Sequence, residues 1–446
     1  MDTPFEKPPE SVWQFRPYMR LWYARVAAAA GVQMLAVAIG WHMYEVTHNL
    51  YDLGMVGLMQ FLPRVLLLFF VGTAVDRYDR RRILGLSLSL QGCVAVILAI
   101  GASPVGFDVG RFHIYALSLI IGIAQSFTMP ALQALLPNVV PPSLLPSAIS
   151  AGASALQGAT IVAPAIGGLI YGIDWHRVGP WASYGLTAAC FFVGATLVWN
   201  VSLMGGRRVS KEPVTLDSVF AGLRFMRTRP DILGAVSLDL FAVLLGGATA
   251  MLPAYAETVL HLKSFGVGLL RAAPAVGALA MSIRLTKHSI KRHVGRKMFG
   301  AVAVFGFATI LFGLSHTIVA GIASLLALPA DGAFVHIGAF TVSMVALVIL
   351  GASDMVSVVI RSSFVQLETP DEMRGRVSAV NSLFIGASNE LGEFESGMVS
   401  GWLGLVPGIV FGGLGTIVVV LLGVKIFPSL AKRDHMITPE EAKRLG

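Results

Sequence analysis

Long apolar runs alternate with short polar segments along almost the whole chain. Each run is long enough for a helix to cross the hydrocarbon core of a bilayer, which takes about 20 residues. The runs lie at residues 22–46, 54–75, 83–102, 112–136, 147–172 and 180–203, and again at 232–257, 265–286, 298–320, 337–361, 376–402 and 405–427. The pattern predicts an all-α polytopic membrane protein with twelve transmembrane helices in two groups of six.

A polar segment at residues 205–231 separates the two groups. Within it, Leu216, Val219, Phe220 and Leu223 recur at helical spacing, and Thr215 is placed to cap the first turn. We expect an amphipathic helix on the membrane surface, with a disordered linker as the alternative. The predicted units are an N-terminal bundle (1–204), a cytoplasmic linker (205–231), a C-terminal bundle (232–428) and a cytoplasmic tail (429–446).

Composition and charge support a membrane location. Hydrophobic residues make up 55% of the chain and charged residues 13%, against about 25% charged in soluble domains. The net charge of +8 does not indicate a nucleic-acid partner, because most Lys and Arg residues fall on one side of the predicted helices. Arg111, Arg177 and Lys263 are the exceptions outside the apolar runs. The positive-inside rule then predicts cytoplasmic termini. We expect a multi-pass protein of a bacterial inner membrane that is a monomer.

The turn between the second and third runs carries a dense charged motif. It reads Gly72-Thr-Ala-Val-Asp76-Arg77-Tyr78-Asp79-Arg80-Arg81-Arg82. A segment with this many charged side chains is excluded from lipid, and we therefore expect an interfacial turn. It is either a basic loop that only sets topology or a latch between conformations. A basic turn at residues 287–297 stands at the same place in the second group but lacks the aspartate.

This motif is similar to the loop between helices 2 and 3 of major facilitator superfamily transporters. The most specific further match is Pro370-Asp371-Glu372-Met373-Arg374-Gly375-Arg376-Val377, and the resemblance covers residues 15–430. More narrowly, the chain looks like the branch of bacterial siderophore (enterobactin) exporters. The resemblance implies two pseudo-symmetric six-helix bundles. It also implies a conformational latch, for which the candidates are Gly72, Asp76, Arg77, Arg80, Arg81, Arg361, Arg374 and Arg376.

Charged groups inside the apolar runs are the candidates for coupling. Such groups cost about 2.5–3.5 kcal/mol or more at the bilayer centre, so they usually face a cavity or each other. The candidate proton carriers are Asp239, Glu393, Glu390 and Asp354, of which we favour Asp239 or Glu393. The alternative for each is a structural ion pair or a polar contact between helices.

Other polar side chains in the runs could face a substrate. Helices 1, 4, 7 and 10 line the cavity in the family that the chain resembles, flanked by 2, 5, 8 and 11. The cavity candidates are Gln33, Gln60, Arg64, Gln125, Gln157, Arg271 and Asn389. Arg64 and Arg271 lie deep enough in their runs to bind an anionic substrate. A few polar groups among apolar walls suit an amphipathic molecule.

The sequence also excludes several kinds of protein. It contains no Walker loop, no His/Cys/Asp cluster with metal spacing and no Gly-x-Ser-x-Gly elbow, so we expect no enzyme and no cofactor. The predicted function is proton-coupled export of a small amphipathic molecule (siderophore, drug or metabolite) by alternating access. An importer or lysophospholipid-flippase-like carrier is one alternative. A non-transporting membrane sensor or partner protein is another.

Overall fold

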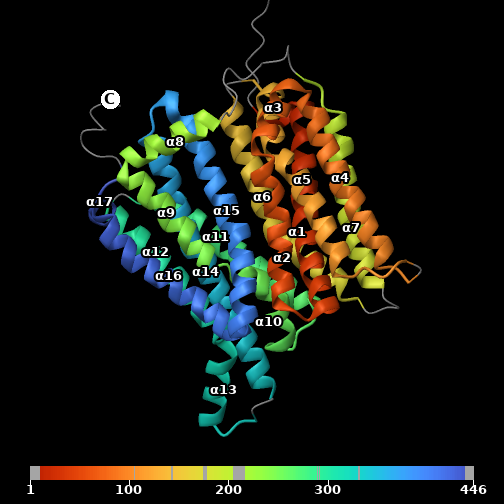
Figure 1. Cartoon of the computed structure of the whole chain (residues 1–446), viewed down its shortest axis with the longest axis vertical. Coiled ribbons are helices and arrows are strands. Elements are labelled where there is room, and N and C mark those ends of the chain that lie inside the picture. The colour runs from red at the N-terminus through yellow and green to blue at the C-terminus, as the bar shows by residue number, and fades with distance from the viewer. Residues whose placement is uncertain are drawn as a thin grey trace, which may run out of the picture.

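The first group of helices contains seven α-helices. The computed structural model describes residues 11–104, 106–141, 144–173, 178–203, 216–288, 290, 292–329 and 332–436, and these ranges contain no β-strand. The helices are α1 (Arg16–Thr47), α2 (Leu50–Leu66), α3 (Leu68–Arg77), α4 (Arg80–Gly101), α5 (Arg111–Leu135), α6 (Leu145–Tyr171) and α7 (Val178–Trp199). They pack against one another as the red-to-yellow part of the molecule (Figure 1).

The second group begins after the predicted linker. Its helices are α8 (Leu216–Thr228), α9 (Pro230–Leu245), α10 (Leu252–Thr258), α11 (Ser264–Lys287), α12 (Val294–Gly313), α13 (Ser315–Leu325), α14 (Ala333–Leu367), α15 (Asp371–Leu403), α16 (Leu405–Ile426) and α17 (Pro428–Lys432). The amphipathic segment therefore forms α8, which packs on α15 where Gly222 meets the backbone of Arg376. The predicted cap, Thr215, lies outside the described residues.

Ten helical stretches in the described chain are long and apolar enough to cross a membrane. Two of the twelve predicted spans do not meet that criterion. Residues 54–75 are divided between α2 and α3, which have 17 and 10 residues. Residues 376–402 lie in α15, a continuous helix of 33 residues with several charged side chains. The ten stretches make this a membrane protein, and the count of twelve spans remains a prediction.

Three predicted spans are interrupted. Pro63 has no N–H to donate to the preceding turn, and α2 ends three residues later, at Leu66. Gly246 and Gly247 separate α9 from α10, and the backbone of Gly247 lies against Gly392 of α15. Leu314 divides α12 from α13.

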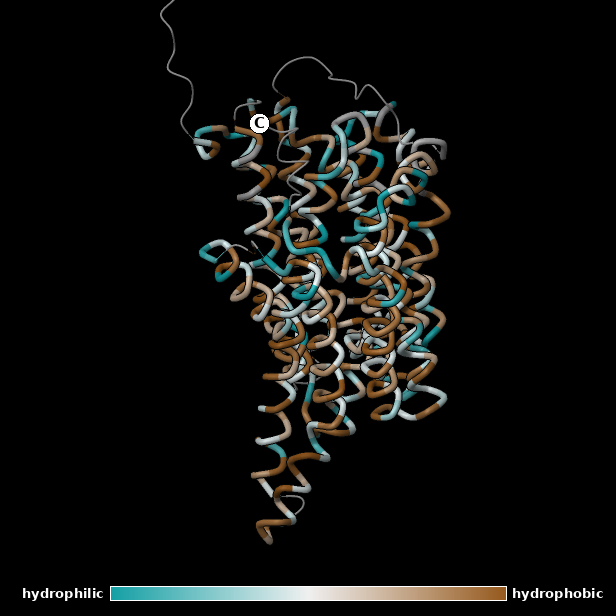
Figure 2. Tube along the Cα trace, turned by 90° about the vertical axis from the view of Figure 1, so that its left-hand side faces the viewer, coloured by the Kyte–Doolittle hydropathy of each residue, from teal (hydrophilic) through white to brown (hydrophobic). Residues whose placement is uncertain are grey.

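The two ends of the molecule differ in charge. The basic turn between α3 and α4 lies at the upper end in Figure 1, together with α8, whereas α10 and α13 lie at the lower end. Figure 2 shows more hydrophilic segments in the upper half and mostly hydrophobic ones in the lower half. We call the upper end the basic end.

The two groups of helices touch closely at the end opposite the basic end. Gly54 of α2 lies against Gly397 of α15, since a Cβ built on Gly54 would be 2.9 Å from the Gly397 Cα. Likewise, a Cβ on Gly168 of α6 would be 3.1 Å from the Gly268 Cα of α11. Small residues let helix backbones approach in this way. The α2/α15 and α6/α11 contacts therefore close that end of the molecule.

Candidate functional site

A cavity of about 840 Å³ lies toward the basic end, lined mainly by the first group of helices and by three residues of α15 from the second group. Most of the lining comes from the halves of α1, α2, α4 and α5 nearest that end and from α3. Leu156 of α6, Val198 of α7 and residues 383–387 of α15 complete it. The lining is mostly apolar, with residues such as Leu21, Val32, Phe61 and Leu88. This size is typical of small-molecule sites, which are about 300–1,000 Å³.

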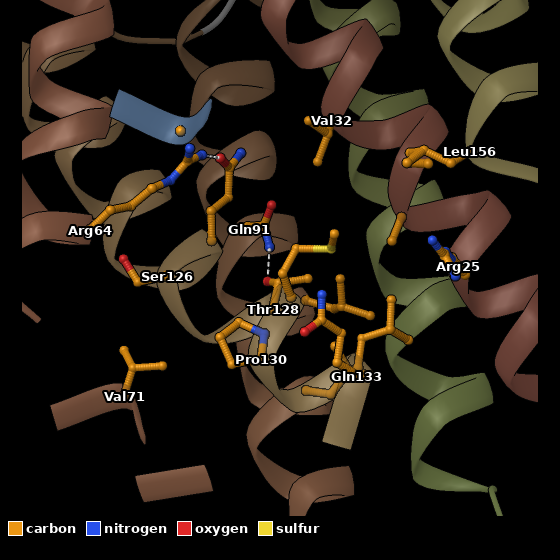
Figure 3. A pocket seen from close by; sticks show the side chains of 18 of the residues that line it. Arg25, Val32, Arg64, Val71, Gln91, Ser126, Thr128, Pro130, Gln133 and Leu156 are labelled. Atoms are coloured by element: carbon orange, nitrogen blue, oxygen red, sulfur yellow. Dashed lines mark hydrogen bonds between the residues drawn. The ribbon is translucent and has the colours of Figure 1, made fainter. Parts of the chain in front are cut away.

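Neutral polar groups line one wall of the cavity. The Gln33 Nε2 donates to the Thr160 Oγ1 at 3.1 Å. The Gln91 Nε2 donates to the Thr128 Oγ1 at 3.3 Å, as Figure 3 shows. The Gln91 side chain is fully buried, and its Oε1 has no hydrogen-bond partner among the described residues. The wall therefore offers hydrogen bonding without charge.

Arg64 of α2 is a charged lining residue whose charge is compensated. Its guanidinium forms an ion pair with Glu390 of α15 and donates a hydrogen bond to the Gln125 Oε1. Because α2 and α15 belong to different groups, this ion pair joins the two halves beside the cavity. Arg64 therefore faces the cavity with a carboxylate already bound.

A second carboxylate of α15 lies near the same place. The Glu393 Oε1 is 4.0 Å from the Arg271 Nη2, and Glu393 also interacts electrostatically with Arg64. With Glu390, this makes a cluster of two acids and two arginines that spans α2, α11 and α15. Its formal charges balance.

A separate charged cluster is buried within the second group. Asp239 of α9 forms an ion pair with Arg361 of α14 and accepts a hydrogen bond from the Ser357 Oγ at 3.2 Å. Asp354 interacts electrostatically with both Asp239 and Arg361. Asp354, Ser357 and Arg361 lie three, four and seven residues apart on α14, so they share a face. This cluster holds two acids and one arginine.

Among the candidate latch residues, Arg80, Arg81 and Arg361 make contacts within one group. Arg80 donates to the Ala134 carbonyl and Arg81 to the Val201 carbonyl, each at 3.0 Å. Asp79 caps α4, and its ion pair with Arg81 lowers the pKa of that carboxyl. Gly72 lines the cavity, Arg361 binds Asp239, and Arg77 and Arg376 both make polar contacts. The side chains of Asp76 and Arg374 lie outside the described residues.

Three of the seven predicted cavity residues line this cavity, namely Gln33, Arg64 and Gln125. Gln157 instead donates to the Ala275 carbonyl at 3.0 Å, which joins α6 to α11. Arg271 faces Glu393, Gln60 packs by its backbone against Gly122, and Asn389 is exposed. These four side chains lie outside the cavity lining.

Sequence reasoning missed several lining residues. They are Arg25, Gln91, Thr128 and Gln133. Arg25 lies close to the start of its apolar run, so it is easily taken for an interfacial residue. Gln91 was detectable, because it follows Ser87 by one helical turn inside an otherwise apolar run.

The chain is similar in sequence to known exporters over nearly its whole length. The family model described as Major Facilitator Superfamily matches residues 21–393. The enterobactin exporter EntS of Escherichia coli O6:K15:H31 is 23% identical, over 96% of this chain and 95% of that protein. The enterobactin exporter EntS of Citrobacter koseri is also 23% identical, over 91% and 90%.

Solved transporter structures resemble this one at low sequence identity. A bacterial homolog of the human lysosomal transporter Spinster, in an inward-facing and unoccupied conformation, has a TM-score of 0.63 and 13% identity, with 93% of this chain and 95% of that chain covered. A bacterial homologue of the iron transporter ferroportin, in an inward-facing state, has a TM-score of 0.60 and 17% identity, with 95% and 100% covered. At such identities the likeness shows the fold alone.

Proposed function

Since this chain belongs to the major facilitator superfamily, we propose that it is a secondary active transporter that exports a small amphipathic molecule in exchange for protons. The observation that carries the proposal is the mostly apolar cavity of about 840 Å³ near the basic end, opposite the close α2/α15 and α6/α11 contacts. A site accessible from one side and closed on the other is what alternating access requires of each conformation. The relatives named as exporters support the outward direction.

The positive-inside rule supports a cytoplasmic location for the basic end. On this assignment the cavity is reachable from the cytoplasm, and both termini lie on that side. The chain then has twelve spans in a bacterial inner membrane, with α2 and α3 together forming the second span and α15 the eleventh. The charges of α15 are tolerated there because they pair with Arg64 and Arg271 instead of facing lipid.

Alternating access requires the bundles at residues 1–204 and 232–428 to rock against each other. The glycine contacts at the closed end would separate, and the basic end would close over the cavity. The Arg64–Glu390 ion pair joins the two bundles beside the site. It is therefore placed to hold the conformation described here and to rearrange when the bundles move.

The charge balance of the two clusters supports assigning the proton to one of them. The cluster of Arg64, Arg271, Glu390 and Glu393 has as many arginines as acids. The cluster of Asp239, Asp354 and Arg361 has one more acid than bases. A buried unpaired charge is costly, and binding one proton removes it. We therefore assign the exchangeable proton to the Asp239–Asp354 pair and give Glu393 the role of an ion-pair partner.

The test uses the full chain in proteoliposomes with an imposed pH gradient. Enterobactin is the siderophore probe and ethidium the drug probe. We expect the gradient to drive flux of at least one probe, and Asp354→Asn to abolish the response to the gradient. Asp108→Asn, in an exposed loop, is the matched control and should behave like the wild type. Wild-type flux of both probes that ignores the gradient would contradict proton coupling.

A further inference from the structure

The cavity lining carries a positive charge that no described carboxylate balances. Among the described lining residues, two are arginines and none is Asp or Glu. Arg64 is neutralised by Glu390. Arg25 of α1 has no described ion pair, and the neighbouring ionisable group that acts on it is the phenol of Tyr18. The excess charge of the cavity therefore resides on Arg25.

The start of α6 leaves space for the Arg25 guanidinium. A Cβ at Gly152 of α6 would overlap the Arg25 Nη1, so the absence of a side chain there makes room for the guanidinium. The Tyr18 hydroxyl donates to the Ala148 carbonyl at 2.9 Å, which joins α1 to the start of α6 on the same side. Figure 3 shows Arg25 and Arg64 on opposite sides of the cavity.

A partly buried arginine without an anion is an unfavourable arrangement that a ligand can relieve. The guanidinium presents five N–H donors in a plane that matches a carboxylate or phosphate in two parallel hydrogen bonds. Because Arg64 already holds a carboxylate, an acidic ligand gains more from Arg25. The hydrogen-bonding residue Gln33 lies eight residues further along α1, about 12 Å at 1.5 Å per residue.

We propose that Arg25 binds the acidic group of an amphipathic anion, whose apolar body extends along α1 toward Gln33. The substrate class is thus a molecule with a carboxylate or phosphate at one end and an apolar remainder. This inference rests on the proposed transport function, and it names the chemistry of the molecule carried. Arg64 and Arg271, the arginines that the sequence offered for an anion, bind the carboxylates of α15 instead.

Binding to the purified full-length protein without any gradient tests the proposal. The first pair of probes is 2-naphthoate and its neutral amide, 2-naphthamide. The second pair is lysophosphatidylglycerol, with an anionic headgroup, and lysophosphatidylcholine, with a zwitterionic one. The variants are Arg25→Gln and Arg25→Lys. The matched control is Arg16→Gln, which removes the same charge from the exposed first turn of the same helix.

We expect the wild type and Arg16→Gln to prefer the anionic member of at least one pair. Arg25→Gln should weaken binding of that anion about tenfold or more and leave the neutral member unchanged, whereas Arg25→Lys should retain part of the preference. A preference in the first pair indicates a free anion, and one in the second pair alone indicates a lipid. Equal binding of both members by the wild type, or an unchanged preference in Arg25→Gln, would overturn the proposal. Neither result would affect a flux driven by the pH gradient. A failure of the Arg25 proposal can therefore be told apart from a failure of the proposed transport function.

Discussion

Replacing Gly168 by alanine should open the closed end of the molecule. A Cβ at this position would lie 2.5 Å from the Ser264 carbonyl oxygen and 3.1 Å from the Gly268 Cα. Ordinary contact begins at 3.4 Å, so α6 and α11 must separate by 3.4 − 2.5 = 0.9 Å. The obstructing atoms are backbone, which cannot move aside as a flexible side chain does.

The expected size of the effect follows from the cost of overpacking. Forcing an extra methyl group into a close contact costs about 1–3 kcal/mol. If only the closed end carries this strain, the ratio of closed to open molecules falls about 5- to 150-fold. Gly158→Ala on the same helix is the matched control, because a Cβ there meets nothing within 4 Å. It should leave the ratio unchanged.

Electron paramagnetic resonance distances measure this ratio directly. Spin labels at Asp108→Cys and Lys263→Cys, in exposed positions of the two groups at the closed end, would report their separation after Cys93 and Cys190 are replaced. Gly168→Ala should shift the distribution to longer distances. A distribution identical to that of Gly158→Ala would refute the claim that this contact closes the molecule.

Three further changes have defined outcomes. Glu390→Gln should lower the melting temperature, because Arg64 loses its ion-pair partner beside the cavity, and adding Arg64→Gln should recover part of the loss; a double variant no more stable than Glu390→Gln would contradict the pairing. Asp79→Ala should cost about 1 kcal/mol through the lost cap, whereas Asp79→Asn keeps the cap and loses only the ion pair with Arg81. The ion pair lowers the pKa of Asp79 in the folded state. The loss of folding stability in Asp79→Asn should therefore be present above the unfolded pKa of the carboxyl and disappear as the pH falls through its folded pKa. A loss of stability that does not depend on pH would contradict this role of the ion pair. Arg433 forms ion pairs with Asp231 at 2.8 Å and with Glu368 at 2.7 Å, so Arg433→Gln should lower the melting temperature by leaving these largely buried acids without their shared cation; an unchanged melting temperature would argue against this three-residue network.

Much of the helical architecture could be predicted from the sequence, because lipid requires about 20 apolar residues per span. The amphipathic spacing of α8 was equally clear. The breaks within predicted spans were not foreseen, although Pro63 is visible in the sequence, and the break at Gly247 involves a partner far along the chain. The backbone approach of Gly247 to Gly392, for example, exists only once α15 packs beside α9.

The candidate site was only partly predictable, for a related reason. The sequence identifies which charges lie in apolar runs but not how they pair. The sequence made Arg64 a candidate for binding a substrate, but Arg64 pairs with Glu390. Arg25 was not among the sequence candidates, and it lies in the cavity lining. The excess charge of the Asp239, Asp354 and Arg361 cluster likewise depends on the packing of α9 against α14.

The central claim is that one cavity becomes accessible from alternate sides under the control of a proton. The most direct measurement compares the closed-end pair of spin labels with a pair at the basic end, Arg82→Cys and Thr228→Cys, in acidic and in alkaline buffer. We expect the change of pH to lengthen one distance while it shortens the other, and Asp354→Asn to abolish both changes. Distances that stay constant, or that lengthen together at both ends, would contradict it.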